Sequence, residues 1–258
     1  MRFLTFLFLI PTLFACNESS KEKPTTTAEI KKEDENEHPK HTANLVHYEG
    51  ALKAIMHEGD LSAKAYLKDH EMETDFYALG ALKDLKGEIL IWNSQPIIST
   101  YEKDKLIIDS TFNHEATLFV YSNVNKWQSI AIPSEIKTSE ELEIFIEKTA
   151  HEKGLDIEKA FPFLIKGPIK ELDWHVINWP EGDTEHSHEK HVSSGKHGEI
   201  SNENVEILGF YSKHHHTIFT HHTTNMHMHF RSQTLQLAGQ VDAMLPGEKM
   251  TLELPLTE

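Results

Sequence analysis

Basic residues and cysteine are scarce in this chain of 258 residues. Lys and Arg total 25 against 41 Asp and Glu, which gives a formal net charge of −16. Only two of the basic residues are arginines, Arg2 and Arg231. Proteins that bind nucleic acids need clustered basic side chains for the phosphates, so we expect no nucleic-acid partner.

Cysteine occurs once, at Cys16, which excludes an intrachain disulfide and a thiolate metal cluster. Cys16 follows an apolar run, Phe3–Ala15, that is too short for an ordinary transmembrane helix but typical of a signal peptide. The ending Leu13-Phe14-Ala15-Cys16 resembles a bacterial lipobox, in which the cysteine is lipidated. The sequence therefore predicts a lipoprotein signal over residues 1–16 and an exported, membrane-anchored protein facing the periplasm or the cell exterior. The alternative is a plain secretory signal with an incidental cysteine.

Residues 17–45 contain few apolar side chains and are rich in Ser, Thr, Lys and Glu. Such a segment cannot bury enough surface to offset its ordering entropy, so we predict a disordered tether. A globular pattern begins at Val46, and we predict an α+β fold of mixed and antiparallel sheets with a few helices. An N-terminal α/β part is expected over 46–155 and a β-rich part, which carries the metal site, over 156–258.

Apolar periodicity predicts three helical segments: Ala51–Met56, a helix capped by Ser62 that runs to His70, and Thr138–Glu152 capped by Ser139. Short β-branched and aromatic runs separated by Lys-Gly, Asn-Ser and Lys-Asp turns predict strands. The predicted strands are Phe76–Leu82, Glu88–Trp92, Ile97–Tyr101, Lys105–Ile108, Ala116–Tyr121, Phe161–Ile165, Glu171–Trp179, Val205–Tyr211, Asn225–Arg231, Gln236–Ala243 and Thr251–Leu256.

Histidines are concentrated late in the chain, where 12 of the 19 fall between His175 and His229. The first of two groups lies in a predicted polar loop over residues 180–204 and consists of His186, His188, His191 and His197. Imidazoles in such a loop can collect zinc or copper ions without a fixed geometry. The alternative is a solvated loop without a role.

The second group contains His227 and His229, which lie two residues apart in a predicted strand. Side chains two apart on a strand point to the same face, and Met226, Met228 and Phe230 would occupy the opposite face. Two imidazoles on one face can chelate one metal ion. A surface strand with no ligand role is the alternative.

Several of these segments resemble the α-acetolactate decarboxylase family in order and spacing, over roughly residues 46 to 256. The similarity identifies the chain as a divergent member of that family. It rests chiefly on Leu79-Gly-Ala-Leu-Lys-Asp-Leu-Lys-Gly-Glu-Ile-Leu, Leu208-Gly-Phe-Tyr-Ser, Met226-His-Met-His-Phe and Ala238-Gly-Gln-Val.

The resemblance implies a zinc site, or a site for another divalent transition metal. His227 and His229 match two of the family's three zinc histidines, and Gln240 stands where the third would be. We expect His221 or His222 to supply the third ligand, with Gln240 bound weakly or hydrogen-bonded nearby.

The same resemblance implies two catalytic residues. Glu88 takes the place of a glutamate that reaches the family's active site, where it would orient the substrate hydroxyl or relay a proton. The family's arginine has no counterpart in residues 172–179, and we expect Arg231, which continues the His227–His229 face, to replace it.

The implied reaction is decarboxylation of 2-acetolactate, a 2-hydroxy-3-oxo acid, to acetoin. Zinc would chelate the substrate oxygens and stabilise the enediolate formed as CO₂ leaves. Two alternatives stay open: a catalytically inactive zinc-binding lipoprotein on the same fold, and a cupin-type oxygenase. Cupins also place His-x-His on a strand, but their glutamate four residues later is Gln233 here. Homodimer formation is left open as well.

Overall fold

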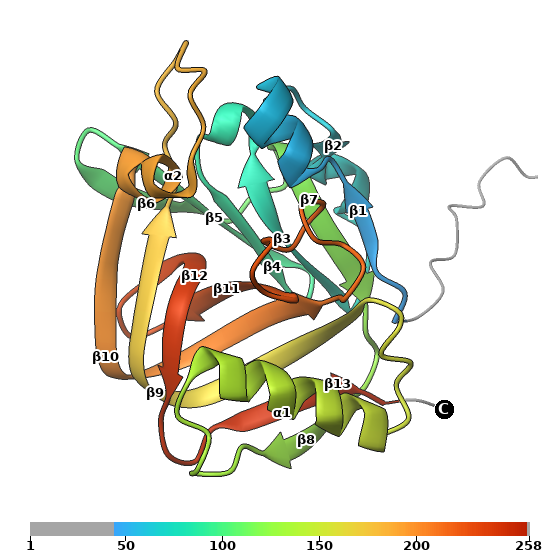
Figure 1. Ribbon diagram of the computed structural model, residues 1–258. Helices are drawn as coiled ribbons and strands as arrows, with labels where there is room; N and C mark the ends of the chain where they lie inside the picture. The colour runs from blue at the N-terminus through green and yellow to red at the C-terminus, as the bar shows by residue number, and fades with distance from the viewer. Residues whose placement is uncertain (1–43, 257–258) are drawn as a thin grey trace, which may run out of the picture. The chain divides into compact units, whose positions relative to one another are not determined.

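A computed structural model describes residues 44–256 of the chain (Figure 1). The predicted signal over 1–16, the lipidation at Cys16 and all but the end of the tether over 17–45 lie outside the described residues. Between residues 44 and 256, no helix is long and apolar enough to cross a membrane.

The first sheet is antiparallel and has seven strands from the N-terminal half of the chain. Its order is β1-β7-β3-β4-β5-β6, and β2 also pairs with β7. The strands are β1 (His47–Glu49), β2 (Ala65–Tyr66), β3 (Phe76–Leu82), β4 (Glu88–Trp92), β5 (Gln95–Glu102), β6 (Lys105–Asp109) and β7 (Glu115–Asn123). Short helical turns connect some of them: η1 (Ala54–Glu58), η2 (Leu67–His70) and η3 (Lys83–Leu85).

Two-residue turns set the register of β4, β5 and β6. Asn93-Ser94 links β4 to β5, and Lys103-Asp104 links β5 to β6. All four residues have positive φ, between 49° and 63°, as type I′ hairpin turns require. The turns predicted from the Asn-Ser and Lys-Asp pairs are therefore confirmed.

The second sheet is also antiparallel, and β9, β10, β11 and β12 pair in a closed ring. The chain enters this sheet between Asn123 and Trp127, earlier than the predicted boundary at 155/156. Its strands are β8 (Trp127–Ala131), β9 (Phe161–Val176), β10 (Lys196–Tyr211), β11 (Met226–Ser232), β12 (Leu237–Pro246) and β13 (Thr251–Pro255). Together with the first sheet, these antiparallel pairings confirm the predicted α+β class.

Helix α1 (Ser139–Glu152) packs across the second sheet (Figure 1). The helix is confirmed, but the prediction that Ser139 caps it is wrong. The N-cap is Thr138, whose side chain accepts the Glu141 amide N–H while the Glu141 carboxylate accepts the Thr138 N–H. The Ser139 hydroxyl is engaged elsewhere, because it donates to the Met244 carbonyl at 2.9 Å.

Two other expectations are corrected by tertiary contacts. Ser62 does not cap a helix that runs to His70, because Ala65 and Tyr66 are drawn into strand β2 by pairing with β7. The predicted polar loop over 180–204 contains helix α2 (His188–Ser194) and the first half of β10. That half of β10 pairs with β9, from Lys196 opposite Val176 onward, so β9 continues without a break through residues predicted as two strands.

The space between the two sheets contains one part of the hydrophobic core, formed by residues such as Leu79 and Leu90 of the first sheet and Leu208 and Phe210 of the second. The other face of the second sheet packs against α1. Side chains of the second sheet that point toward the first sheet are thus enclosed, and the candidate site lies on this face.

Candidate functional site

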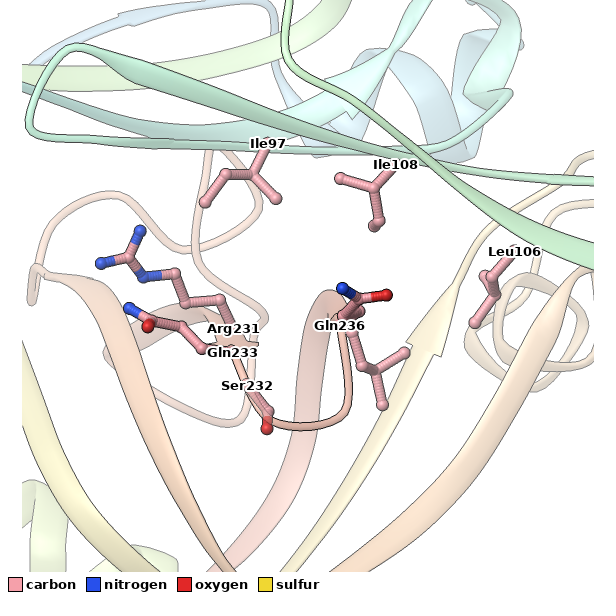
Figure 2. A pocket seen from close by; sticks show the side chains of 8 residues that line it. Ile97, Leu106, Ile108, Arg231, Ser232, Gln233 and Gln236 are labelled. Carbon is pink, nitrogen blue, oxygen red and sulfur yellow. The ribbon is translucent and has the colours of Figure 1, made fainter.

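Arg231 lies in a groove of about 600 Å³ between the β5–β6 hairpin and the β11–β12 turn (Figure 2). Its cross-strand neighbour on β10 is Glu206, and the Arg231 Nε donates to the Glu206 carboxylate at 2.8 Å. The guanidinium also lies 4.6 Å from the ring centroid of Trp92. The structure therefore does not bring Arg231 to the predicted metal ligands, because an opposing carboxylate and an aromatic ring hold it in the groove.

A second cavity, of about 690 Å³, has a size usual for small-molecule sites. It contains the other predicted site residues except His229, which lies buried beneath its wall. The polar side chains that matter for its chemistry are Glu88, His175, His188, His191, His221, His222, His227, Gln240 and Asp242.

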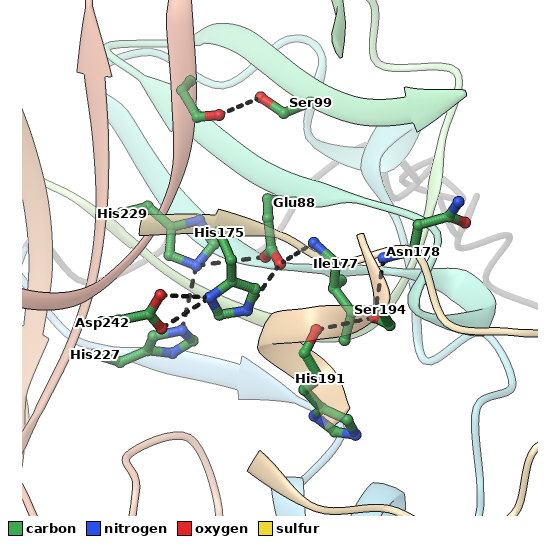
Figure 3. A network of polar contacts seen from close by, with 11 residues as sticks. Glu88, Ser99, His175, Ile177, Asn178, His191, Ser194, His227, His229 and Asp242 are labelled. Atoms are coloured by element: carbon green, nitrogen blue, oxygen red, sulfur yellow. Dashed lines mark hydrogen bonds and ion pairs between the residues drawn. The ribbon is translucent and has the colours of Figure 1, made fainter. Parts of the chain in front are cut away.

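His227, which lines this cavity, and His229, which does not, form the centre of a buried polar cluster that we call the floor (Figure 3). Their Nε2 atoms are 3.2 Å apart, and both side chains are buried. Met226, Met228 and Phe230 point to the opposite face, into the core under α1, which confirms the predicted alternation. Burial lowers the pKa of His227 to about 4 and that of His229 well below its ordinary value, so both rings are neutral at pH 7.

His175 on β9 is a member of the cluster that the sequence analysis missed. It lies opposite Gln240 on β12, and Gln240 lies opposite His229 on β11, so the three occupy one row across three strands. The Asp242 carboxylate accepts the His175 Nδ1–H at 2.8 Å (Figure 3). A signal was present in the sequence, because the apolar alternation of residues 172, 174 and 176 turns residue 175 away from the core.

Gln240 lies opposite His229 on β11 and opposite His175 on β9, and its side chain opposes part of the effect of burial on the pKa of His227. The strand register therefore places Gln240 beside His229, and its role as a weak ligand stays a prediction. The row of residues across β9, β12 and β11 presents an amide between two imidazoles.

Glu88 on β4 faces this row from the first sheet, and only 3% of its surface is exposed. Its Oε1 accepts the Ile177 N–H at 3.2 Å and lies 3.8 Å from His175 Nε2, while its Oε2 lies 3.7 Å from His229 Nε2 (Figure 3). Oε2 has no hydrogen-bond partner in the described residues. Burial raises the pKa of Glu88 to about 7, against the opposing influence of His175 and the Ile177 N–H.

The pKa of His175 moves in the direction opposite to those of its two histidine neighbours. Burial lowers it, but the hydrogen bond to Asp242 and the charge of Glu88 outweigh burial and raise the pKa above its usual value. The floor of the cavity therefore combines two neutral imidazoles with a Glu88–His175–Asp242 chain that can hold protons near pH 7.

His221 and His222 lie nearer the entrance of the cavity, in the segment between β10 and β11. The His221 ring has its centroid 4.0 Å from that of His222 and 5.4 Å from that of His188 on α2. Within residues 44–256, no hydrogen bond, ion pair or ring contact joins these two residues to the His227–His229 pair. Glu88 lies beside His229 and His175, and the role of His221 or His222 as third ligand stays a prediction.

The floor of the cavity has the donor types that zinc prefers. Two zinc-bound nitrogens of a tetrahedral site lie roughly 3.4 Å apart, and the His227 and His229 Nε2 atoms lie at 3.2 Å. Within residues 44–256, no group of three His, Cys, Asp or Glu side chains is already arranged around a metal position. The Glu88 carboxylate oxygens are the next donors. They lie 3.7 Å from His229 Nε2 and 3.8 Å from His175 Nε2, a few tenths of an ångström more than the separation of two zinc-bound atoms. The Asp242 contact to His175 is the kind of carboxylate support that ligating histidines have.

The buried, neutral state of His227 predicts acid sensitivity of the metal-free chain. The unfolded-state pKa is near 6.5 and the folded-state pKa about 4, so the unfolded chain binds more protons between these values. Compared with His227→Asn, the unchanged chain should lose about 1.4 kcal/mol of unfolding free energy per pH unit between pH 6.5 and 4. Urea unfolding in the presence of a chelator measures this difference. His57→Asn is the control, since His57 is solvent-exposed; an equal slope in both comparisons would contradict the prediction.

Comparisons with known proteins agree with this architecture. No family model matches the sequence, and no curated protein matches it either. Among solved structures, a Staphylococcus aureus protein of unknown function described as similar to α-acetolactate decarboxylase matches at a TM-score of 0.65 and 14% identity, over 83% of this chain and 87% of that one. α-Acetolactate decarboxylase of Bacillus subtilis strain 168 matches at 0.63 and 14%, over 83% and 86% of the two chains. Acetolactate decarboxylase of B. subtilis subspecies spizizenii matches at 0.64 and 15%, over 83% and 87%. The chain therefore has an acetolactate-decarboxylase-like fold.

Proposed function

We propose that the chain is a metal-dependent carboxy-lyase that converts 2-acetolactate, a 2-hydroxy-3-oxo acid, to acetoin. The observation that supports the proposal most is the juxtaposition of Glu88 with His227, His229 and His175, of which all but the fully buried His229 line a cavity of about 690 Å³. The likeness of the fold to two acetolactate decarboxylases adds support at the level of the fold.

His227, His229 and His175 are the residues that would hold the ion. Their rings are of the type zinc prefers, and Asp242 fixes the orientation of His175 through its Nδ1. A divalent ion at this place would supply Lewis-acid polarisation of the adjacent hydroxyl and carbonyl oxygens of the substrate. Gln240 lies opposite both His229 and His175 in the strand register.

Glu88 is the residue proposed to handle protons. When the carbon–carbon bond to the carboxylate breaks, CO₂ leaves and the electron pair of that bond passes toward the neighbouring carbonyl. The carbon that bore the carboxylate must then receive a proton. A carboxyl group with a pKa of about 7 can hold and release a proton near neutral pH. The Ile177 N–H orients Glu88 through Oε1, which leaves Oε2 facing the histidine pair.

The test is acetoin formation by the full chain, supplied with zinc, from 2-acetolactate. We expect acetoin well above the spontaneous rate, sensitivity to a chelator, and loss of at least 100-fold of the turnover in His229→Ala. The control is His114→Ala, which removes a histidine that contacts Asp109 and does not line the cavity, and it should leave turnover unchanged. If the full chain with zinc bound forms no acetoin from 2-acetolactate, the proposal is wrong.

One observation favours the alternative, a zinc-binding protein without catalysis. Among the described residues that line the cavity there is no arginine, while histidines are numerous. If the ion binds and no 2-hydroxy-3-oxo acid is decarboxylated, this second candidate is preferred.

A further inference from the structure

We propose that His188, His221 and His222 form a second site for a divalent transition-metal ion, at the entrance of the cavity. This site is separate from the histidines at the floor and does not depend on the proposed decarboxylation.

The three histidines come from two separate segments that the fold brings together. His188 is the first residue of α2, and its ring centroid lies 5.4 Å from that of His221 in the β10–β11 connection. Two imidazoles bound to one tetrahedral ion have centroids roughly 5 Å apart. The ring of His222 lies beside that of His221, at 4.0 Å, closer than two rings on one ion, so the proposed site requires the His222 side chain to rotate.

The ring nitrogens of these residues have few competing partners. The His221 Nδ1 contacts the Thr223 Oγ1 at 2.8 Å, which orients the ring and leaves Nε2 for a ligand role. In the part of the chain described by the structure, no hydrogen bond is made by the ring nitrogens of His188 or His222. The nearby Glu143 is occupied by Thr224 and Asn225, so it does not serve as an anionic partner for the imidazoles.

The chemistry of the three donors selects the kind of ion. Neutral imidazoles bind Zn²⁺, Ni²⁺ and Cu²⁺ well, whereas Ca²⁺ and Mg²⁺ require oxygen ligands. Three protein ligands leave the fourth tetrahedral position to water, because His188 and His222 are solvent-exposed. His227 of the floor lines the same cavity, so the entrance site and the floor site share one cavity.

The first experiment measures zinc bound per full chain by equilibrium dialysis. Replacement of His188, His221 and His222 together by alanine should remove one zinc relative to the unchanged chain. The matched control is His214→Ala/His216→Ala, which removes two histidines of the same connection that instead contact Glu158 and Asn225. Retention of all zinc by the triple variant, or an equal loss in the control, would overturn the entrance site.

A second experiment separates the entrance from the floor. His227→Ala/His229→Ala should keep the entrance ion, and adding the triple substitution to it should remove one further zinc. Because the entrance ion would tie α2 to the β10–β11 connection, zinc should also slow proteolytic cleavage within residues 184–198 in the unchanged chain. If zinc protected the triple variant equally, the ion would not be bound by these residues and the inference would fail.

Discussion

Glu88→Gln should reduce acetoin formation by about 10²–10⁴-fold while the chain stays folded. Glutamine has almost the same shape and keeps an oxygen for the Ile177 N–H, but it cannot accept and release a proton. The loss should appear in kcat more than in KM, because the carboxyl group acts on the reacting carbon rather than on substrate binding.

The same substitution should change stability in a direction that identifies the buried carboxyl group. The folded-state pKa of about 7 lies above the unfolded value of 4.5, so the stabilisation from Glu88 is present below pH 4.5 and is lost as pH rises through 7. In the metal-free chain, Glu88→Gln should therefore gain stability relative to the unchanged chain between pH 5 and 8, by up to about 3 kcal/mol.

The control for Glu88→Gln is Glu253→Gln, which removes a largely buried glutamate that pairs with Lys166 on the second sheet. It should leave acetoin formation intact and should lose rather than gain stability. Full turnover of Glu88→Gln would show that proton handling does not pass through this residue.

His227→Ala and His229→Ala should each abolish tight zinc binding at the floor, by at least about 100-fold in affinity. The Nε2 atoms of the two rings converge to 3.2 Å, and loss of one leaves too few protein ligands for a tight site. His175→Ala should have a similar effect. Asp242→Asn should cost less, about 10–100-fold, because it removes only the support of His175.

Gln240→His provides the matched gain-of-function variant. Gln240 lies between His175 and His229 in the strand register, so an imidazole there would add a donor to the same row. Zinc affinity should rise, and isothermal titration of the metal-free full chains would measure it.

If His227→Ala and His229→Ala both kept full zinc occupancy of the floor, these histidines would be structural and the metal-dependent reaction would be excluded.

Local patterns in the sequence were sufficient for strands β3, β4 and β11 and for helix α1, but not for β8 or the first half of β10. The alternation of Met226, Met228 and Phe230 with two histidines fixed which face of β11 is buried under α1 and which presents imidazoles. The boundaries of β3 and β4 agree with the prediction residue by residue. Such features depend on a few neighbouring residues, because side-chain direction repeats every two positions in a strand.

Contacts between residues distant in the chain explain why other predictions from local sequence patterns were wrong. Arg231 shares the face of His227 and His229, yet Glu206 on the neighbouring strand and Trp92 on the other sheet hold its guanidinium away from them. The helix predicted from the periodicity near Ser62 does not form, because β2 pairs with β7. This pairing supplies the backbone of Ala65 and Tyr66 with the hydrogen bonds that a helix would otherwise make.

The sequence by itself determined that two imidazoles share one face of a strand and that a glutamate opens strand β4, whereas it predicted mixed and antiparallel sheets and the structure has antiparallel strand pairs in both. Only the tertiary structure decided that His175 and Glu88 complete the cluster. His175 reaches it through the register of β9 with β12 and of β12 with β11, and Glu88 reaches it because the two sheets pack face to face. Strand register and sheet packing depend on residues distant in the chain, and the burial that raises the pKa of Glu88 exists only once those layers are assembled.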